Sequence, residues 1–272
     1  MAKPLLIIAE SFGIGGMETY ISGEIRALVG LGREVHLVCG KNFDPTMVPA
    51  AVTSVTSGLA LGPEASIEEL VVSVDVLRQI VREKGIGVIH AHPFTSLVSA
   101  LACAELEALP LVITLHGPSS VMGSYGPAYD FVQSSLVLPK ASVVLAVSEE
   151  IRRLAEPYAA PGRLRVQPNV VDTPAQKEVE VSGRWLLVSR FDKDKASGIE
   201  TFVRAAHDAG IEGVDLCGAG VEQERLQALF DREFPAGFAN CIGATADASA
   251  LMPAYAGVAG MGPGVVGGLA SE

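Results

Sequence analysis

Short apolar runs alternate with stretches of helical spacing along the first part of the chain. Five runs are hydrophobic at nearly every position, as strands buried on both faces of a sheet are: Leu5–Ala9, Glu34–Cys39, Val88–Ala91, Leu111–Leu115 and Ser142–Val147. The spacing between them predicts helices at Met17–Gly30, Ile67–Gly85, Thr95–Leu109 and Glu149–Tyr158, the last with Ser148 as N-cap. Strands alternating with helices indicate a parallel, doubly wound α/β sheet. We therefore expect a Rossmann-like domain over residues 1–160.

A second alternation follows a stretch rich in proline, glycine and charge, which predicts a linker over residues 161–183. Strands are expected at Trp185–Ser189, Gly213–Cys217, Phe238–Ile242 and near Gly257–Gly260. Helices are expected at Gly198–Ala209, Glu222–Phe234 and Ala248–Tyr255. These elements predict a second Rossmann-like domain over residues 184–272. It is shorter than the ~100–150 residues of a common domain, so we expect an incomplete sheet through which the chain could self-associate.

Composition and charge narrow the choice of partners. The formal net charge of −11 argues against a nucleic-acid partner, because such proteins gather lysine and arginine. Four widely separated cysteines in apolar runs predict free thiols and a cytoplasmic location. The uncharged stretch Tyr255–Ser271 is too rich in glycine for the ~18 apolar residues of a spanning helix. We expect no transmembrane segment, with peripheral membrane contact left open.

A glycine-rich loop follows the first predicted strand. Gly13, Gly15 and Gly16 precede a helix, where backbone N–H groups can approach a phosphate. A plain tight turn is the alternative. The spacing is not GxGxxG, and Glu34 is poorly placed for a ribose, which argues against a nicotinamide dehydrogenase.

Histidines end two predicted strands. His90 and His92 close one strand and His116 closes the next, at the edge where doubly wound sheets bind ligands. Histidine pairs can bind zinc, but the sequence shows no third ligand with proper spacing, so we expect no metal. Contact with a ligand is favoured over a purely structural role.

Two cations lie in the loop after strand Trp185–Ser189. Arg190 can bind a diphosphate through a bidentate fork, and Lys195 as a point charge. Lys193, between two aspartates, is expected to be solvated.

Seven motifs then occur in a recognisable order: GGMETYI, IHAH, TLHGP, VLAVSEEIRRL, VQPNVVD, LLVSRFDKDKASGIETFVRAA and DLCGAGVEQERLQAL. Over nearly its whole length the chain resembles the GT-B-fold glycosyltransferases of family 4. The resemblance implies two Rossmann-like domains facing each other across a cleft. It implies transfer of a sugar, of the hexosyltransferase type, from a nucleotide-sugar donor to a carbohydrate, small-molecule or lipid acceptor. Transfer would proceed with retention, with no cofactor and no required metal.

The resemblance also assigns residues to the donor and acceptor sides. It implies that His116 contacts the donor sugar as the catalytic candidate and that Arg190 and Lys195 grip the phosphates. The remaining residues that it implies are Gly15 and Gly16 at the diphosphate, Gly218 and Gly220 beside the nucleobase and ribose, and Glu18, His92 and Asn169 on the cleft or acceptor side.

One departure from the family pattern lies near the end. Two glutamates usually bind the donor ribose and sugar hydroxyls, and Ala259 and Gly267 stand in their places here. The run Val258–Leu269 is therefore expected to be poorly packed or covered by another chain. Two alternatives stay open: a catalytically inert Rossmann-like binding module, or a truncated transferase without a competent donor site. A GT-B-fold sugar-nucleotide epimerase is disfavoured by the motifs VSRFDKDKASG and AVSEE.

Overall fold

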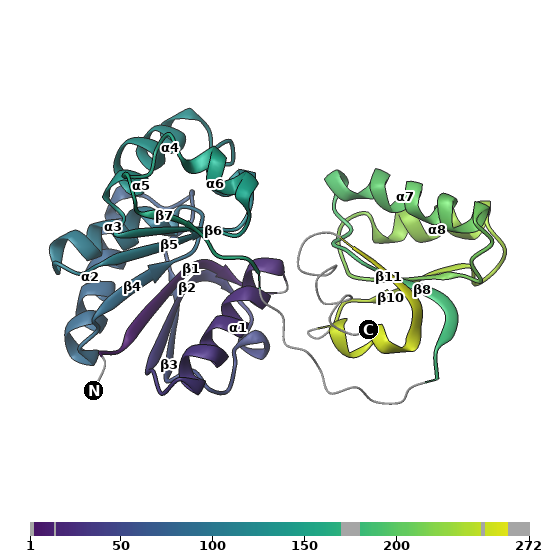
Figure 1. Ribbon diagram of the computed structural model, residues 1–272, viewed down its shortest axis with the longest axis horizontal. Coiled ribbons are helices and arrows are strands. Elements are labelled where there is room, and N and C mark those ends of the chain that lie inside the picture. The colour runs from purple at the N-terminus through teal and green to yellow at the C-terminus, as the bar shows by residue number, and fades with distance from the viewer. Residues whose placement is uncertain (1–2, 14, 170–179, 246–247, 261–272) are drawn as a thin grey trace. The chain divides into compact units, whose positions relative to one another are not determined.

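The chain forms two compact units, residues 1–169 and 170–272, in the computed structural model (Figure 1). The structure describes residues 3–13, 15–169, 180–245 and 248–260. Ordered strands extend into the stretch 161–183 from both sides: β7 (Leu164–Val166) ends the first sheet and β8 (Ser182–Val188) begins the second. Among the described helices, none is both long and apolar enough to cross a membrane.

The first unit is built on a seven-stranded sheet in the order β3-β2-β1-β4-β5-β6-β7, and each described strand pair is parallel. Its other strands are β1 (Leu5–Phe12), β2 (Val35–Phe43), β3 (Ser54–Leu59), β4 (Val88–Ala91), β5 (Leu111–Leu115) and β6 (Val143–Ala146). The strand order reverses between β1 and β4, and ligands of open α/β sheets bind at such a reversal, beyond the carboxyl ends of the strands. The predicted doubly wound α/β fold is confirmed.

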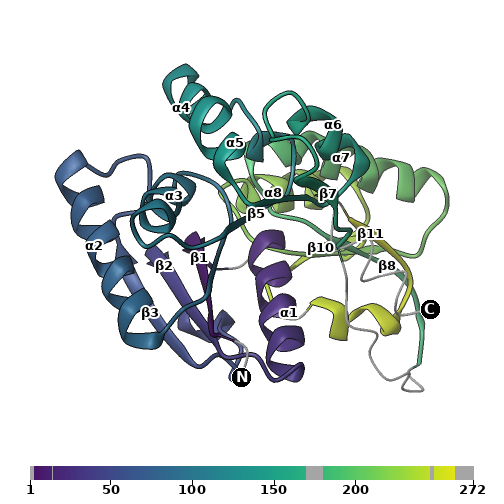
Figure 2. The ribbon, with the colours of Figure 1, turned by 60° about the vertical axis from the view of Figure 1, so that its left-hand side comes forward.

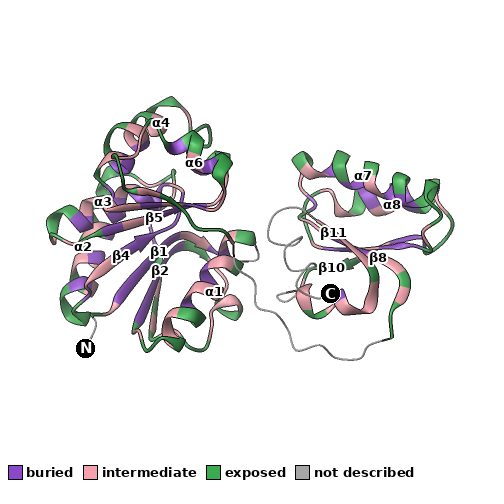
Figure 3. Cartoon of the chain, viewed as in Figure 1, coloured by how far each residue is buried: buried purple, intermediate pink, exposed green. Residues whose placement is uncertain are grey.

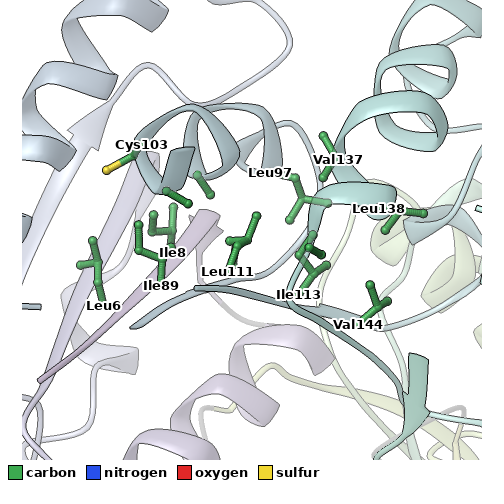
Figure 4. Packing of buried hydrophobic residues seen from close by; sticks show 14 of the residues in the cluster. Leu6, Ile8, Ile89, Leu97, Cys103, Leu111, Ile113, Val137, Leu138 and Val144 are labelled. Atoms are coloured by element: carbon green, nitrogen blue, oxygen red, sulfur yellow. The ribbon is translucent and has the colours of Figure 1, made fainter. Parts of the chain in front are cut away.

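Helices cover both faces of this sheet, because β1 is apolar on both sides. Ile7 packs with Ile21 and Ile25 on one face, whereas Leu6 and Ile8 pack on the other (Figure 4). Figure 2 shows α1 and the pair α2–α3 on opposite sides of the strands. The described α-helices of the unit are α1 (Gly16–Gly30), α2 (Ile67–Lys84), α3 (Ser96–Leu106), α4 (Pro127–Val132), α5 (Leu138–Lys140) and α6 (Glu149–Ala155), with the π-helical turn η3 (Gln133–Val137) between α4 and α5. Two 3₁₀ turns, η1 (Pro45–Met47) and η2 (Pro118–Ser120), lie in loops.

Two helix ends show how local sequence sets these boundaries. Ser66 and Glu69 form a reciprocal capping box at the start of α2, and Gly85 ends the helix in the left-handed conformation. Ser148 accepts a hydrogen bond from the backbone N–H of Ile151, so its predicted role as the N-cap of α6 is confirmed.

The second unit has a smaller parallel sheet in the order β10-β9-β8-β11. Its remaining strands are β9 (Val214–Cys217), β10 (Ala239–Gly243) and β11 (Tyr255–Gly260), and its helices are α7 (Lys193–Asp208) and α8 (Gln223–Glu233). Both helices bury one stripe, including Val203 and Phe230, and expose the other (Figure 3). Leu186 and Met252 belong to a second, smaller cluster.

Three sequence-based expectations in this unit need correction or fall outside the description. The predicted helix Ala248–Tyr255 is wrong: two 3₁₀ turns, Ala248–Ala250 and Met252–Ala254, stand there, since Pro253 lacks the N–H that a longer helix needs. Helix α7 begins at Lys193, five residues before the predicted start. Of the run Val258–Leu269, residues up to Gly260 pair with β8 and Val258 packs on a core cluster. The rest of that run lies outside the described residues.

Candidate functional site

Histidines lie side by side at the carboxyl ends of two neighbouring strands. His92 follows β4 and His116 follows β5, and these strands pair in parallel with Ala91 beside Ile113. Nδ1 of His92 lies 2.9 Å from Nε2 of His116, and the two rings stack with centroids 5.1 Å apart. The structure thus joins two residues that the sequence placed 24 positions apart.

A carboxylate from α1 completes this group. Oε1 of Glu24 accepts a hydrogen bond from Nδ1 of His90 at 2.8 Å, and Oε2 lies 3.3 Å from Nε2 of His92. His92 is fully buried and the Glu24 side chain is 18% exposed. The sequence-based prediction did not include Glu24. The sequence holds one indication of its position: Glu24 lies beside Ile25 and one helical turn from Ile21, and both isoleucines are buried.

This enclosure shifts the pKa values of the ionisable groups. Burial lowers the pKa of His92 to about 4, and burial together with the neighbouring His92 and His90 lowers that of His116 to about 2. Burial alone would raise the pKa of Glu24, but His90 and the hydrogen bonds from both histidines bring it well below its usual range. At neutral pH the group therefore contains an ionised carboxylate and uncharged rings at His92 and His116.

Two further side chains frame the histidines. Oγ1 of buried Thr114 lies 2.8 Å from Nε2 of His90. The ring of Tyr20, from the second turn of α1, stands edge-on to His116 with centroids 4.9 Å apart. Burial and the charge of Glu24 raise the pKa of this phenol, so it stays un-ionised at neutral pH.

The same group meets a geometric requirement for a cation. Glu24, His90 and His92 place three ligand-type atoms within 4.8 Å of one another. The expectation that the histidines lack a third ligand is thus corrected, because α1 supplies one from outside the local sequence. The contacts that these side chains make with one another, and those of His90 with Thr114 and of His92 with His116, hold the group together without a cation.

A second carboxylate ties together the loops on both sides of the histidines. Oε2 of Glu10, in β1, accepts hydrogen bonds from the backbone N–H of Thr95 at 2.7 Å and from its hydroxyl at 2.6 Å. Oε1 accepts one from the Tyr125 hydroxyl at 3.0 Å. Thr95 lies just after His92, and Tyr125 lies in the loop after His116. One side chain therefore bonds both loops.

The glycine loop leads into α1 at the same unit. Gly15 is the N-cap of α1 in an extended conformation, and its carbonyl accepts from the backbone and the hydroxyl of Thr19. The Glu18 carboxylate folds back over this turn: its Oε2 would lie 2.4 Å from a Cβ at Gly15. Gly16 is the first helical residue. A nearly buried acid thus already stands in the first turn, where the positive end of the helix favours negative charge.

In the second unit, Arg190 and Lys195 lie at the turn from β8 into α7. Arg190 is 63% exposed and pairs with Asp192 at 3.0 Å. Lys195, in the first turn of α7, pairs with Asp194 at 3.2 Å. Both predicted phosphate-binding cations therefore follow the same strand, and each contacts an aspartate one or two positions away in the chain.

Gly218 and Gly220 bring the loop after β9 against the loop after β8. A Cβ at Gly218 would lie 1.8 Å from the Ser189 carbonyl oxygen, and one at Gly220 would lie 2.4 Å from that of Phe191. The backbone N–H of Phe191 donates to Ala219 at 2.9 Å across the same contact. Only glycine permits this approach.

Asn169 and the two positions that depart from the family pattern lie apart from these groups in the sequence. Asn169 ends the first unit, and its buried Oδ1 has no hydrogen-bond partner among the described residues. Ala259 sits within β11, opposite Leu187 of β8, and packs on the core of the second unit. Gly267 lies outside the described residues.

Comparison with known proteins places these groups in context. The sequence profile described as Glycosyltransferase Family 4 matches residues 14–174, more than half of the chain. This range contains Glu24 and all the histidines of the buried group. No curated protein sequence matches the chain.

Solved structures resemble the chain in fold. Anabaena Alr3699/HepE in complex with UDP-glucose has a TM-score of 0.77 and 18% identity over 99% of this chain and 79% of that chain. Sucrose-phosphate synthase from Thermosynechococcus elongatus has a TM-score of 0.62 and 18% sequence identity, over 99% of this chain and 73% of that chain. UDP-N-acetylglucosamine 2-epimerase from Rickettsia bellii has a TM-score of 0.58 and 10% sequence identity, over 95% of this chain and 74% of that chain. Identities this low establish a shared fold, which transferases and an epimerase have in common.

Proposed function

Because the chain belongs to glycosyltransferase family 4, we propose that it transfers a sugar from a nucleoside diphosphate sugar to a hydroxyl-bearing acceptor. The bond from the anomeric carbon to the diphosphate breaks, and a bond to the acceptor oxygen forms with retained configuration. The acceptor proton leaves with the nucleoside diphosphate. A carbohydrate, a small molecule or a lipid would each supply such a hydroxyl.

The observation that carries the proposal is the family match over residues 14–174, which contains the histidine group at the sheet edge. In the proposal, the partly exposed ring of His116 contacts the donor sugar, and Glu18 and Asn169 serve the acceptor side. His92, which the sequence assigned to the acceptor side, is fully buried and acts on a ligand only through His116. Gly15 and Gly16 approach the diphosphate. Neutral, pre-bonded rings suit a hydroxylated ligand, because they need no rearrangement when it binds.

The second unit supports the departing group in this proposal. Arg190 and Lys195 bind the diphosphate and stabilise its growing negative charge, so no metal is needed there. Gly218 and Gly220 leave room for the ribose and the base beside the backbone. Uridine donors are the first to test, since the Alr3699/HepE structures contain UDP and UDP-glucose.

One observation favours a second candidate of another class, a binding module without transferase activity. Ala259, which the family resemblance aligns with a donor-binding acid, lies in a strand and packs on the core. A chain without that acid could bind a nucleotide sugar and leave it intact.

Saturation-transfer NMR against a panel of UDP-, GDP- and ADP-sugars tests the shared part of both candidates. We expect signals from the nucleotide and sugar protons of one donor class. A product assay with that donor and a set of hydroxylated acceptors then separates them. Transfer with retained anomeric configuration supports the transferase, and binding without any transfer or hydrolysis supports the binding module. No binding across the panel would contradict both.

A further inference from the structure

The geometry points to Glu24 as a positioning residue that acts through His92 to fix the proton of His116 on Nε2. His116 then offers Nδ1 as a hydrogen-bond acceptor for a hydroxyl of the substrate. The identity of that substrate rests on the proposed function, whereas the chain Glu24–His92–His116 rests on contacts within the first unit alone.

The first step is the contact between Glu24 and His92. A carboxylate only accepts hydrogen bonds, and a neutral imidazole has one N–H and one lone pair. Oε2 of Glu24 and Nε2 of His92 are both buried and lie 3.3 Å apart, and neither atom has a hydrogen-bond partner elsewhere among the described residues or a contact with each other that meets full hydrogen-bond geometry. A lone pair on Nε2 would face the carboxylate oxygen in a place without water, which is costly. The proton of His92 therefore sits on Nε2, directed at Glu24.

The second step passes this choice on to His116. With its proton on Nε2, His92 has a lone pair on Nδ1. The 2.9 Å contact must then be a hydrogen bond donated by Nε2–H of His116. This leaves a lone pair on Nδ1 of His116, for which the described part of the chain provides no protein donor. The backbone N–H of His116 is itself bonded to the Ser120 hydroxyl at 3.1 Å, which steadies the residue.

A cation bound within the group would place the proton of His116 on the other ring nitrogen. A cation bound by Glu24, His90 and His92 would take the lone pair of Nε2 of His92. His92 would then carry its proton on Nδ1 and donate it to Nε2 of His116. His116 would expose an N–H instead of a lone pair. The position of one proton on His116 therefore reports which state the buried group adopts.

Two-bond ¹H–¹⁵N correlation NMR of uniformly ¹⁵N-labelled protein reads this position directly. The chain has only five histidines, which single substitutions can assign. At neutral pH we expect the Nε2–H pattern for His116 and for His92. An Nδ1–H pattern for His116 in the unmodified protein overturns the inference, whatever the variants do. Stoichiometric zinc in the purified protein, measured by atomic emission, overturns it as well.

Variants of Glu24 test whether the carboxylate causes the preference. In Glu24→Gln, the amide oxygen can keep the bond to His90 while the NH₂ group donates to His92, so the His116 pattern should reverse. In Glu24→Leu the preference should weaken. We expect the tautomer ratio of His116 to change at least about tenfold in either variant. An unchanged ratio in both overturns the inference.

Glu34→Gln is the matched control, because Glu34 pairs with buried His36 at 3.3 Å in another part of the unit. Glu34→Gln should leave the tautomer ratio of His116 unchanged. A change as large as that in the Glu24 variants overturns the inference that Glu24 sets this ratio. The saturation-transfer panel on the same samples separates this inference from the proposed function. Nε2–H on His116 without nucleotide-sugar binding supports the inference and ends the proposed function. Binding with Nδ1–H on His116 ends the inference alone.

Discussion

The carboxyl edges of the two sheets are built in different ways. In the first unit, His92, His116 and Glu24 come from three elements and are bonded to one another in a buried group. In the second unit, Arg190 and Lys195 are more exposed, and each pairs with an aspartate one or two positions away. Tertiary packing sets the first arrangement, and local sequence sets the second.

This difference decides how each edge can respond to a ligand. The buried group keeps its geometry without losing side-chain freedom on binding. The two cations must leave their aspartates and give up rotamer freedom before they can bind a phosphate. In the proposed function, the first edge would therefore orient the ligand, and the second would supply positive charge once the two ion pairs open. Four changes test this contrast.

Acid should produce the largest difference. The pKa values of His92 and His116 lie below those of an unfolded chain, so the unfolded state binds protons first as the pH falls below about 6.5. Stability is complete above that pH and declines toward about 4 for His92 and about 2 for His116. For each histidine, the free energy of unfolding falls by about 1.4 kcal/mol for each pH unit below about 6.5. The loss for the pair is then roughly 4 kcal/mol by about pH 5. The lowered pKa of Glu24 extends the loss below about pH 4.5.

Urea unfolding at about pH 7 and about pH 5 can follow the two units separately. The chain has one tryptophan, Trp185, in β8 of the second unit. We expect the circular dichroism transition to gain an early phase at the lower pH, while the Trp185 fluorescence transition moves much less. Equal movement of both signals would contradict the assignment of acid sensitivity to the histidine group.

Gly218→Ala should destabilise the second unit by about 3 kcal/mol, because the new Cβ meets the Ser189 carbonyl and backbone must move. Gly198→Ala is the matched control. Gly198 lies within α7 with nothing within 4 Å of its Cβ position, so alanine should stabilise the helix by about 1 kcal/mol. Trp185 fluorescence in urea measures both. If Gly218→Ala also raised the free energy of unfolding, the loop after β9 would have to relax around the new Cβ.

Lys195→Ala should weaken binding of the preferred nucleotide at least tenfold, the loss of one charge-assisted contact of about 1.5–3 kcal/mol. Lys193→Ala removes an equal charge from an exposed position two residues away and should change affinity by less than about twofold. Isothermal titration calorimetry with the donor found by NMR measures both. Equal losses of affinity in the two variants would mean that Lys195 acts only through its general positive charge and makes no specific contact with the nucleotide.

The smallest effect should come from removing a competing aspartate. Asp192→Asn frees Arg190 from its ion pair at an exposed site, where such pairs contribute about 0–1 kcal/mol. Affinity for the nucleotide should rise about two- to threefold in the same titration. The side chain of Asp192 makes no capping hydrogen bond, so helix α7 should not suffer. Weaker binding would show that Asp192 orients Arg190 instead of competing for it.

The same contrast explains what the sequence could predict. Buried strands such as Val88–Ala91 and Leu111–Leu115 have local patterns, and their bounds were predicted correctly. The places of Arg190 and Lys195 after β8 were predicted correctly because their setting is also local, and their binding of a phosphate stays a prediction. Glu24 was missed, since its contacts are with histidines more than 60 positions away that packing of α1 brings within reach. Strand β3 was missed because its alternating burial is that of a sheet edge.

Glu10 gives the first edge a property that concerns its motion. Because one carboxylate bonds Thr95 and Tyr125, the segments that follow His92 and His116 cannot fluctuate independently. Native-state hydrogen exchange should therefore show a common opening free energy for amides of both segments, and Glu10→Gln should lower it in both together. Separate opening energies would contradict this. Ligand exchange at this edge would then depend on a single cooperative event, whose rate one side chain controls.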